Sequence, residues 1–319
     1  MKKVAATIFL VVMACIVVAC NSSRVEGSES TVEAVVAEYN ALVAQYNVAV
    51  AAHNDAIPAI VGANTYLEEI ITDATLALNS GELPFDPQTS IALEQSISTA
   101  MAGMMTVPNL LPLKEEVIIP VDATTSEREE IEQTVIAEKD ALIKISFPDT
   151  PTTPDYTVSI ETIKENQIAF QNSIQGLKQV TAPSDDFVMD RLKELDTILG
   201  LAAVTKNHDP NGYLGAPGGY IGCIYFSDER VDKRGWDIEP EKYNVIDIGT
   251  IGGGSIEVYG TVEEAQTRDT YLASFDNTSL DRGTHTVVGT LIVRISSKLA
   301  HDQQIDLENQ IITVLTEIQ

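Results

Sequence analysis

The chain has 319 residues, of which 47 are acidic and 20 are basic, so its formal net charge at pH 7 is −27. A field of this sign repels nucleic acid and anionic lipid headgroups, and we therefore expect no nucleic-acid partner. Calcium and other cations are its natural counter-charges, although acidity by itself also keeps an exported protein soluble. The length exceeds the usual single hydrophobic core, so two or more domains are expected.

The first twenty residues have the pattern of a bacterial lipoprotein export signal. Lys2 and Lys3 precede an apolar run over residues 4–19, and Cys20 is followed by polar residues. A basic start, an apolar core and small residues before the cut are typical of a secretory signal peptide. The run is shorter than the roughly 20 residues that cross a bilayer, which disfavours an uncleaved membrane helix. We expect residues 1–19 to be removed and Cys20 to carry a diacylglycerol and a palmitate-type acyl chain.

The three cysteines support the same interpretation. Cys15 also fits the local pattern of a cleavage site, but a cut there would leave the apolar residues 16–19 on the mature surface. Cleavage before Cys20 removes Cys15 and uses Cys20 for the lipid, so that Cys223 remains alone and no intramolecular disulfide forms. Because no histidine neighbours Cys223 in the sequence, it is predicted to be a buried structural thiol.

Residues 31–206 are predicted to be helical, after a tether at 20–30. Apolar and aromatic residues recur every seven positions from 31 to 57, which predicts one long amphipathic helix. Tyr39-Asn40, Tyr46-Asn47 and His53-Asn54 repeat as a unit along it. We interpret this stripe as a packed helix seam flanked by asparagines, since one histidine cannot build a metal site.

Further helices are expected over 59–78, 87–106, 126–145, 158–180 and 184–204. A proline-containing connection at 110–120 precedes the third of these, where Ser126 and Glu129 fit a capping box. The stretch 147–154 contains three prolines and three threonines and is predicted to be a linker.

The composition and the hydrophobic pattern change near residue 207, where glycines cluster and short apolar runs replace the helical pattern. Strands are predicted over 220–226, 243–248, 255–259 and 285–296, and helices over 262–275 and 302–317. The expected fold class is α+β. It consists of N-terminal multi-helix bundle modules, then a small α/β domain at 207–319 with a short sheet and two main helices.

Common catalytic sets are missing from the sequence. It has no His-x-x-x-His pair, no Cys pair and no Gly-x-Ser-x-Gly elbow, so zinc hydrolysis and the usual triads are not expected. The glycine run 249–255 lacks the lysine of a phosphate loop and is interpreted as a turn. A calcium loop starting at Asp209 would need glutamate at its twelfth position, where Tyr220 stands. We expect neither a resident metal nor a cofactor.

Several polar residues are nevertheless candidates for ligand binding. Strand alternation places Glu257 and Arg294 on the less apolar faces of two runs, and they meet, with Tyr259 beside them, if those strands are neighbours. The alternative to a ligand-binding arginine is a cross-strand ion pair. The turn 209–212 offers side-chain oxygens, with reverse-turn chemistry as its alternative. The candidate set is Asp209, Asn211, Glu257, Tyr259, His285 and Arg294.

Motifs in the C-terminal third and apolar spacing in the helical part carry a family resemblance. The motifs cover 178–183, 203–212, 218–220, 256–259, 269–276 and 285–290, and the spacing runs from Leu67 to Ala100. The C-terminal motifs resemble a family of uncharacterised Gram-positive lipoproteins. The apolar spacing of the helical part is similar to the FIVAR and Ebh-type three-helix modules of cell-wall-associated proteins. The resemblance implies a cell-surface location and a spacer or adhesive role, with no catalytic residues to transfer.

These observations together predict a membrane-anchored lipoprotein on the outer face of the bacterial cytoplasmic membrane. Its helical part would present the C-terminal domain to a ligand, and its partners would be the bilayer, through the lipid on Cys20, and a cell-wall polymer or surface protein. One alternative is a hydrolase or transferase acting on wall polymers, with Asp209, Asp276 and His285 as acid/base groups. Another is an accessory subunit of a membrane complex.

Overall fold

The computed structural model describes residues 31–232 and 244–318. Its described residues fall into two compact units: unit 1 contains those up to Ile57 and Asn109–Pro151, and unit 2 contains Pro58–Pro108 and those from Thr152 onward. The expected signal peptide, the tether and Cys20 lie outside the described residues. Helices accompany one antiparallel five-stranded sheet, which confirms the α+β class.

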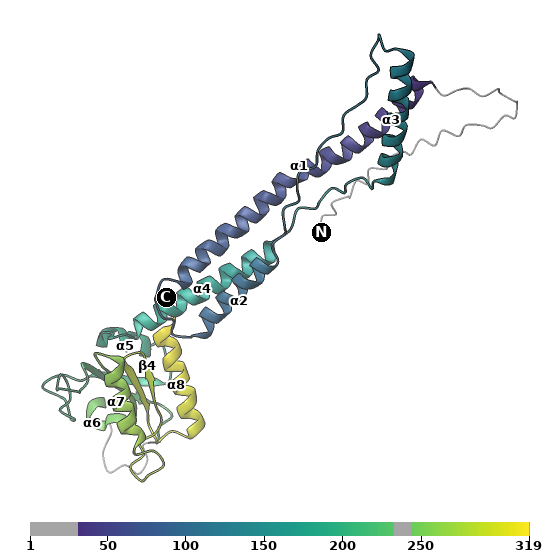
Figure 1. Cartoon of the computed structure of the whole chain (residues 1–319). Coiled ribbons are helices and arrows are strands. Elements are labelled where there is room, and N and C mark those ends of the chain that lie inside the picture. Colours follow the sequence, from purple (N-terminus) through teal and green to yellow (C-terminus); the bar gives the residue numbers. More distant parts are fainter. Residues whose placement is uncertain (1–30, 233–243, 319) are drawn as a thin grey trace. The chain divides into compact units, whose positions relative to one another are not determined.

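The heptad pattern forms helix α1, which extends over Val32–Leu78 (Figure 1). Two helices were expected here, one ending at 57 and one starting at 59, but Pro58 lies inside a single helix. A proline in a helix interior removes one backbone hydrogen bond and crowds the preceding turn without necessarily ending the helix. The division between the two units falls at this proline.

Unit 1 is built from the first part of α1 and from helix α3, Thr125–Lys144. Its core is apolar and combines five residues of α1 with two of α3: Val32, Val35, Val36, Tyr39, Val43, Val135 and Leu142. The capping box of α3 is Thr124 with Glu127, not Ser126 with Glu129 as expected. Both pairs have the required spacing, and the extended backbone at Thr124 selects the earlier one.

An extended segment of unit 1 is fastened to α1 by three asparagine side chains, here named the asparagine ladder. Each side-chain amide donates to a backbone carbonyl of the segment and accepts from the N–H of the same residue. The pairs are Asn40 with Val117, Asn47 with Lys114 and Asn54 with Leu111, at 2.8–2.9 Å. Seven helical residues rise about 10.5 Å and three extended residues about 10 Å, so the two spacings match.

His53 lies beside the last pair of the asparagine ladder. Its Nδ1 is 2.9 Å from the carbonyl oxygen of Asp149 and its Nε2 is 3.2 Å from that of Asn109. The ring therefore contacts the backbone of both extended segments of unit 1. The predicted helix seam is thus a packed face of α1, and the asparagines beside it bind the backbone of the extended segment.

The helical part of unit 2 consists of the last turns of α1 with helices α2, Gln88–Ala102, and α4, Thr157–Gln179. Their shared apolar residues include Leu67, Leu93, Ile97, Ile163 and Phe170. This pairing of helices follows the expected amphipathic spacing.

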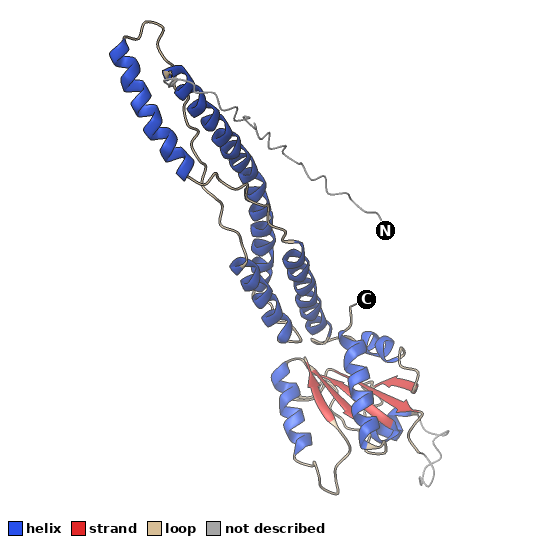
Figure 2. Ribbon diagram, turned by 90° about the vertical axis from the view of Figure 1, so that its right-hand side faces the viewer, coloured by secondary structure: helices blue, strands red, loops and turns tan. Residues whose placement is uncertain are grey.

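The remainder of unit 2 contains the sheet, shown in red in Figure 2. In chain order its elements are α5 Asp185–Leu192, β1 Ile198–Ala203, β2 Gly222–Asp228, α6 Val245–Ile248, η2 Gly249–Gly252, β3 Gly253–Val258, α7 Val262–Ala273, β4 His285–Val288, β5 Leu291–Ile295 and α8 His301–Thr316. The strands lie in the order β1-β2-β3-β5-β4, with every pair antiparallel.

Strand alternation gives the sheet two different faces. One face is apolar and packs against α5 and α8, with Phe226, Ile256 and Val293 among its buried residues. The opposite face packs against α6 and α7 and mixes apolar residues with polar ones, including Glu257 and Arg294. Because side chains alternate along a strand, the polar residues of β3 and β5 are gathered beneath α7.

Two expectations at the start of this region are corrected by the structure. A helix was expected to reach residue 204 and the α/β domain to begin at 207, but α5 ends at Leu192 and residues 198–203 form the edge strand β1. This strand pairs with β2 over Ala203↔Ile224 and neighbouring residues. Tertiary pairing therefore overrides the helical propensity of an alanine- and leucine-rich segment.

Two predicted strands also differ. Residues 245–248 form α6 because the Asn244 side chain caps it, accepting from the N–H of Ile246 at 2.7 Å; Tyr243 lies outside the described residues. The run 285–296 is a hairpin of β4 and β5 that turns at Gly289, where φ is +61°. A Cβ at this position would lie 2.4 Å from the carbonyl oxygen of Val180, so only glycine fits the turn.

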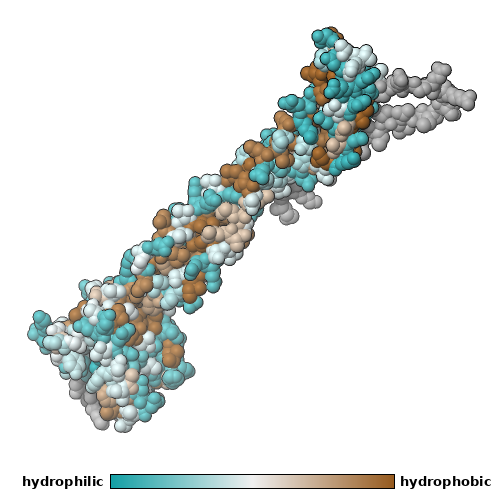
Figure 3. Space-filling view, in the orientation of Figure 1, coloured by the Kyte–Doolittle hydropathy of each residue, from teal (hydrophilic) through white to brown (hydrophobic). Residues whose placement is uncertain are grey.

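Apolar side chains are distributed unevenly over the surface. Figure 3 shows brown, apolar areas on parts of the helical surface and mostly hydrophilic or neutral residues on the visible face of the sheet-containing region. The extended segment of unit 1 exposes Ile118 by 84% and Val121 by 99%. Among the described helices, none combines the length and hydropathy needed to cross a bilayer.

Candidate functional site

The centre of the candidate site is Glu257, a carboxylate on β3 that is only 1% exposed beneath α7. Arg268 of α7 donates to it twice, from Nε to Oε2 at 2.9 Å and from Nη2 to Oε1 at 3.0 Å. Arg294 of β5 donates from Nη1 to Oε1 at 2.7 Å, and the Tyr259 hydroxyl donates to Oε2 at 2.9 Å. The predicted meeting of Glu257, Arg294 and Tyr259 is confirmed, and so is the cross-strand ion pair.

The electrostatics of this cluster favour the charged form of Glu257. Burial by itself would raise the pKa of the carboxyl group, but the hydrogen bonds and positive charges of Arg268 and Arg294 outweigh it and hold the pKa below its ordinary value. Two guanidinium groups therefore share one carboxylate. The buried cluster carries one net positive charge in a strongly acidic chain.

A cleft of about 450 Å³ opens beside this cluster. Its walls include three arginines and four aromatic rings, and its lining residues include Arg268, Arg282, Arg294, Tyr213, Tyr225, Tyr271, Phe275 and Leu280. The Arg268 guanidinium lies 5.8 Å from the ring centre of Tyr213 and 5.4 Å from that of Tyr271. Cation–π contacts at this range add to the two bonds from Glu257 and hold Arg268 in place.

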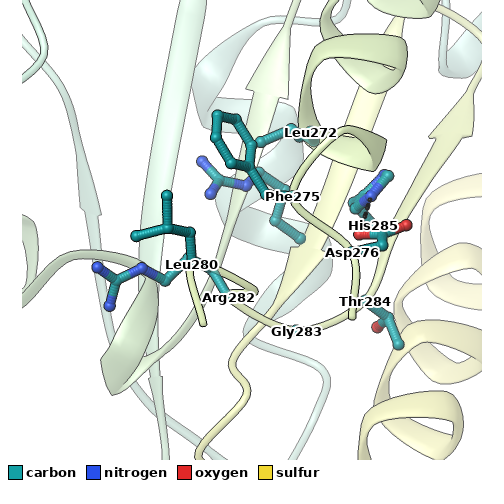
Figure 4. Close-up of a pocket in the computed structure, with 9 residues that line it drawn as sticks. Leu272, Phe275, Asp276, Leu280, Arg282, Gly283, Thr284 and His285 are labelled. Atoms are coloured by element: carbon teal, nitrogen blue, oxygen red, sulfur yellow. Dashed lines mark hydrogen bonds and ion pairs between the residues drawn. The ribbon is translucent and has the colours of Figure 1, made fainter. Parts of the chain in front are cut away.

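Arg282 is the exposed arginine of the cleft: its backbone is held by a hydrogen bond while its side chain is exposed. Its carbonyl oxygen accepts from the N–H of Ser297 at 2.9 Å, and neighbouring Asp281 accepts from the N–H of Gly283 at 2.8 Å. Figure 4 shows the Arg282 side chain extending on the side of Leu280, away from Asp276 and His285. Within the described residues, its guanidinium has no hydrogen-bond or ion-pair partner.

Tyr225 places a hydroxyl group at the cleft. It accepts a hydrogen bond from Nδ2 of Asn211 at 2.8 Å, and burial is the main cause that raises its pKa to about 12. The hydroxyl group is therefore protonated at neutral pH and keeps its own proton available for donation. Asn211 itself lines the cleft and holds the Tyr225 hydroxyl group in place.

Asp209 has a structural role in the same loop. Its carboxylate accepts from the Tyr220 hydroxyl at 2.6 Å and from the N–H groups of Leu214 at 2.7 Å and Asn211 at 3.1 Å. Burial raises the pKa of Asp209, but these bonds outweigh it and lower the pKa overall. Reverse-turn chemistry, the alternative interpretation of this segment, accounts for these contacts.

His285 lies at a second hollow, of about 460 Å³, which Asp276, Asp281 and His301 also line. Its Nδ1 is 2.7 Å from Asp269 and its Nε2 is 3.2 Å from Asp276. The alternative acid/base groups are thus not one site, because Asp209 lines neither this hollow nor the neighbouring pocket of Figure 4. In the described part of the chain, no three His, Cys, Asp or Glu side chains converge as metal ligands do.

The thiol of Cys223 is expected to resist alkylation in the folded protein. It is fully buried, and burial raises its pKa well above the ordinary value, so almost no thiolate forms at neutral pH. The rate with a soluble thiol reagent is measured on a chain with Cys15 and Cys20 replaced by alanine, with and without denaturant. Equal rates in the two conditions contradict the prediction.

Sequence reasoning missed Arg268 and Arg282. A signal was present in the sequence. Only 20 of the 319 residues are basic, yet three arginines lie between 268 and 294 with no lysine among them. Their convergence on Glu257 and the cleft depends on how α7 and the following loop pack on the sheet. Comparison with protein families, curated proteins and solved structures gives no match for this chain.

Proposed function

We propose that this chain is an exported lipoprotein, anchored through Cys20, whose helical part serves as a spacer for a C-terminal ligand-binding domain. The observation that carries the binding role is the cleft beside Glu257, with its three arginines and its aromatic walls. Pockets of several hundred Å³ that combine apolar walls with a few convergent polar groups are typical of small-molecule sites.

The spacer role is supported by the length of the helical segment in unit 1. Residues 32–57 of α1 alone rise about 39 Å at 1.5 Å per residue. Folding of this segment is reinforced by the asparagine ladder, which attaches extended chain along it. A spacer of this kind needs stiffness more than a large core.

Replacing Cys20 by alanine is expected to abolish metabolic labelling with a radioactive fatty acid, because the thiol is the acceptor of the diacylglycerol. Cys15→Ala is the matched control and should label like the parent chain. The measurement is fatty-acid incorporation into the immunoprecipitated protein. Labelling that persists in Cys20→Ala, or disappears in Cys15→Ala, contradicts the assignment.

The binding role is tested by retention of cell-wall and surface components on the immobilised protein, with and without calcium. We expect a component that the parent chain retains and Arg282→Ala does not. Fragments of wall polymer incubated with the same protein distinguish the enzymatic alternative, since turnover lost in His285→Ala favours a hydrolase or transferase. Equal retention by the parent chain and the Arg282 variant contradicts a binding role for the cleft.

A further inference from the structure

We propose that the cleft beside Glu257 binds a dianionic phosphate monoester attached to a flat or aliphatic body, with Arg282 as the residue that contacts the phosphate. This inference rests on the proposed function in taking the cleft as the binding face of the C-terminal domain. It adds a ligand class and a residue that the sequence did not identify.

Charge favours an anionic ligand in this cleft. Three guanidinium groups line it, and two of them, those of Arg268 and Arg294, are already bound to Glu257. The lining carboxylate Asp247 contacts Nε2 of His208, at 2.7 Å. Within the described residues no carboxylate is bound to Arg282, so an anion is attracted there, and a dianion more strongly than a monoanion.

The cleft also supplies hydrogen-bond donors for the oxygens of a phosphate group. Arg268 donates to Glu257 from Nε and Nη2, and Arg294 donates to Glu257 from Nη1. Among the described residues, nothing accepts from the guanidinium group of Arg282 or from the Tyr225 hydroxyl, so both remain available as donors to a ligand. Arginine forks bind phosphate oxygens in bidentate fashion, and such charge-assisted bonds are among the strongest in proteins.

The walls of the cleft offer apolar surface to the body of such a ligand. Tyr271 and Phe275 form an edge-to-face pair with ring centres 5.1 Å apart, and both line the cleft with Leu280. These side chains offer apolar surface next to the cationic end. A bare phosphate ion leaves that surface uncovered, so a ligand with a body is favoured over the ion alone.

The test is a calorimetric titration of the full-length protein, solubilised in mild detergent, with three probes. Phenyl phosphate is the dianion with a ring, inorganic phosphate lacks the ring, and benzoate is a monoanion with a ring. The pH is kept above 7, because the second ionisation of a phosphate monoester occurs near pH 6. We expect phenyl phosphate to bind at least about tenfold more tightly than either other probe.

Variants of Arg282 test whether phenyl phosphate binds in this cleft. Arg282→Ala is expected to weaken phenyl phosphate binding by about tenfold or more, the usual size of one lost charge-assisted contact. Arg282→Lys should recover part of the affinity, because it restores charge without the fork. Lys298→Ala, which removes another exposed cation of the same domain, is the control and should bind like the parent chain. Folding is expected to survive in Arg282→Ala, because the side chain has no partner to lose.

Any of these results overturns the inference: no binding of phenyl phosphate by the parent chain, equal affinity in Arg282→Ala, or an affinity for benzoate or inorganic phosphate equal to that for phenyl phosphate. None of these bears on lipid labelling of Cys20 or on retention of a wall component. A chain that fails the probe titration but retains a ligand on the immobilised protein keeps the proposed function and loses only the phosphate assignment.

Discussion

Replacing Glu257 by glutamine is expected to lower the free energy of unfolding of the C-terminal part by about 3–5 kcal/mol. The carboxylate is 1% exposed and is the shared acceptor of Arg268 and Arg294. Glutamine keeps the volume but removes the negative charge, so two guanidinium groups remain beneath α7 with no counter-charge. The loss is measured as the shift of the urea unfolding midpoint at constant slope.

The matched control is Glu263→Gln, which removes an exposed carboxylate from the first turn of α7. Exposed charges near a helix N-terminus contribute roughly 0.3–1 kcal/mol, well below the effect expected at Glu257. Losses of equal size in the two variants contradict the role assigned to the buried carboxylate.

Acid should remove the same stabilisation from the parent chain. The pKa of Glu257 is below its ordinary value of 4.5 in the folded state, so the folded protein binds fewer protons than the unfolded chain. The contribution of Glu257 is therefore complete above about pH 4.5 and is lost as the pH falls through the folded pKa. In Glu257→Gln this group cannot titrate, and the stability gap between the two proteins should narrow below pH 4.5. A constant gap contradicts this explanation.

Replacing Asn40, Asn47 and Asn54 together by alanine is expected to release the extended segment 109–120 of unit 1. Each change leaves a backbone N–H and C=O of the segment without its partner, at a cost of about 1–3 kcal/mol for each ladder residue. In the parent chain the amides of Leu111, Lys114 and Val117 should exchange with solvent more slowly than their neighbours, giving protection at every third residue. Hydrogen exchange followed by NMR tests this pattern in both proteins.

Gln45→Ala is the control for the asparagine ladder, since it removes an exposed amide of the same helix that makes no side-chain hydrogen bond within the described residues. Exchange in the 109–120 segment should not change in this variant. Uniform exchange along the segment of the parent chain, with no minimum at the three paired amides, contradicts the proposed fastening.

Local features of the sequence determined most of the secondary structure. The amphipathic repeats of α1, α2, α4 and α8, and the alternation of β2, β3 and β5, each depend on residues a few positions apart. The same alternation predicted that Glu257 and Arg294 would face each other if their strands were neighbours. Capping signals were less specific. At the start of α3, both Thr124 with Glu127 and Ser126 with Glu129 have the spacing of a capping box, and only the backbone conformation selects the first pair.

The acidic charge follows from the sequence alone, and the export signal stays a prediction from it. The tertiary structure decided which strands are neighbours, that Pro58 remains inside a helix, and that residues 198–203 pair with β2. It also brought Arg268 onto Glu257 and Arg282 to the edge of the cleft, and it gave the repeated asparagines their backbone partners. Each of these features depends on contacts between segments far apart in the chain, whose free energies no local pattern contains.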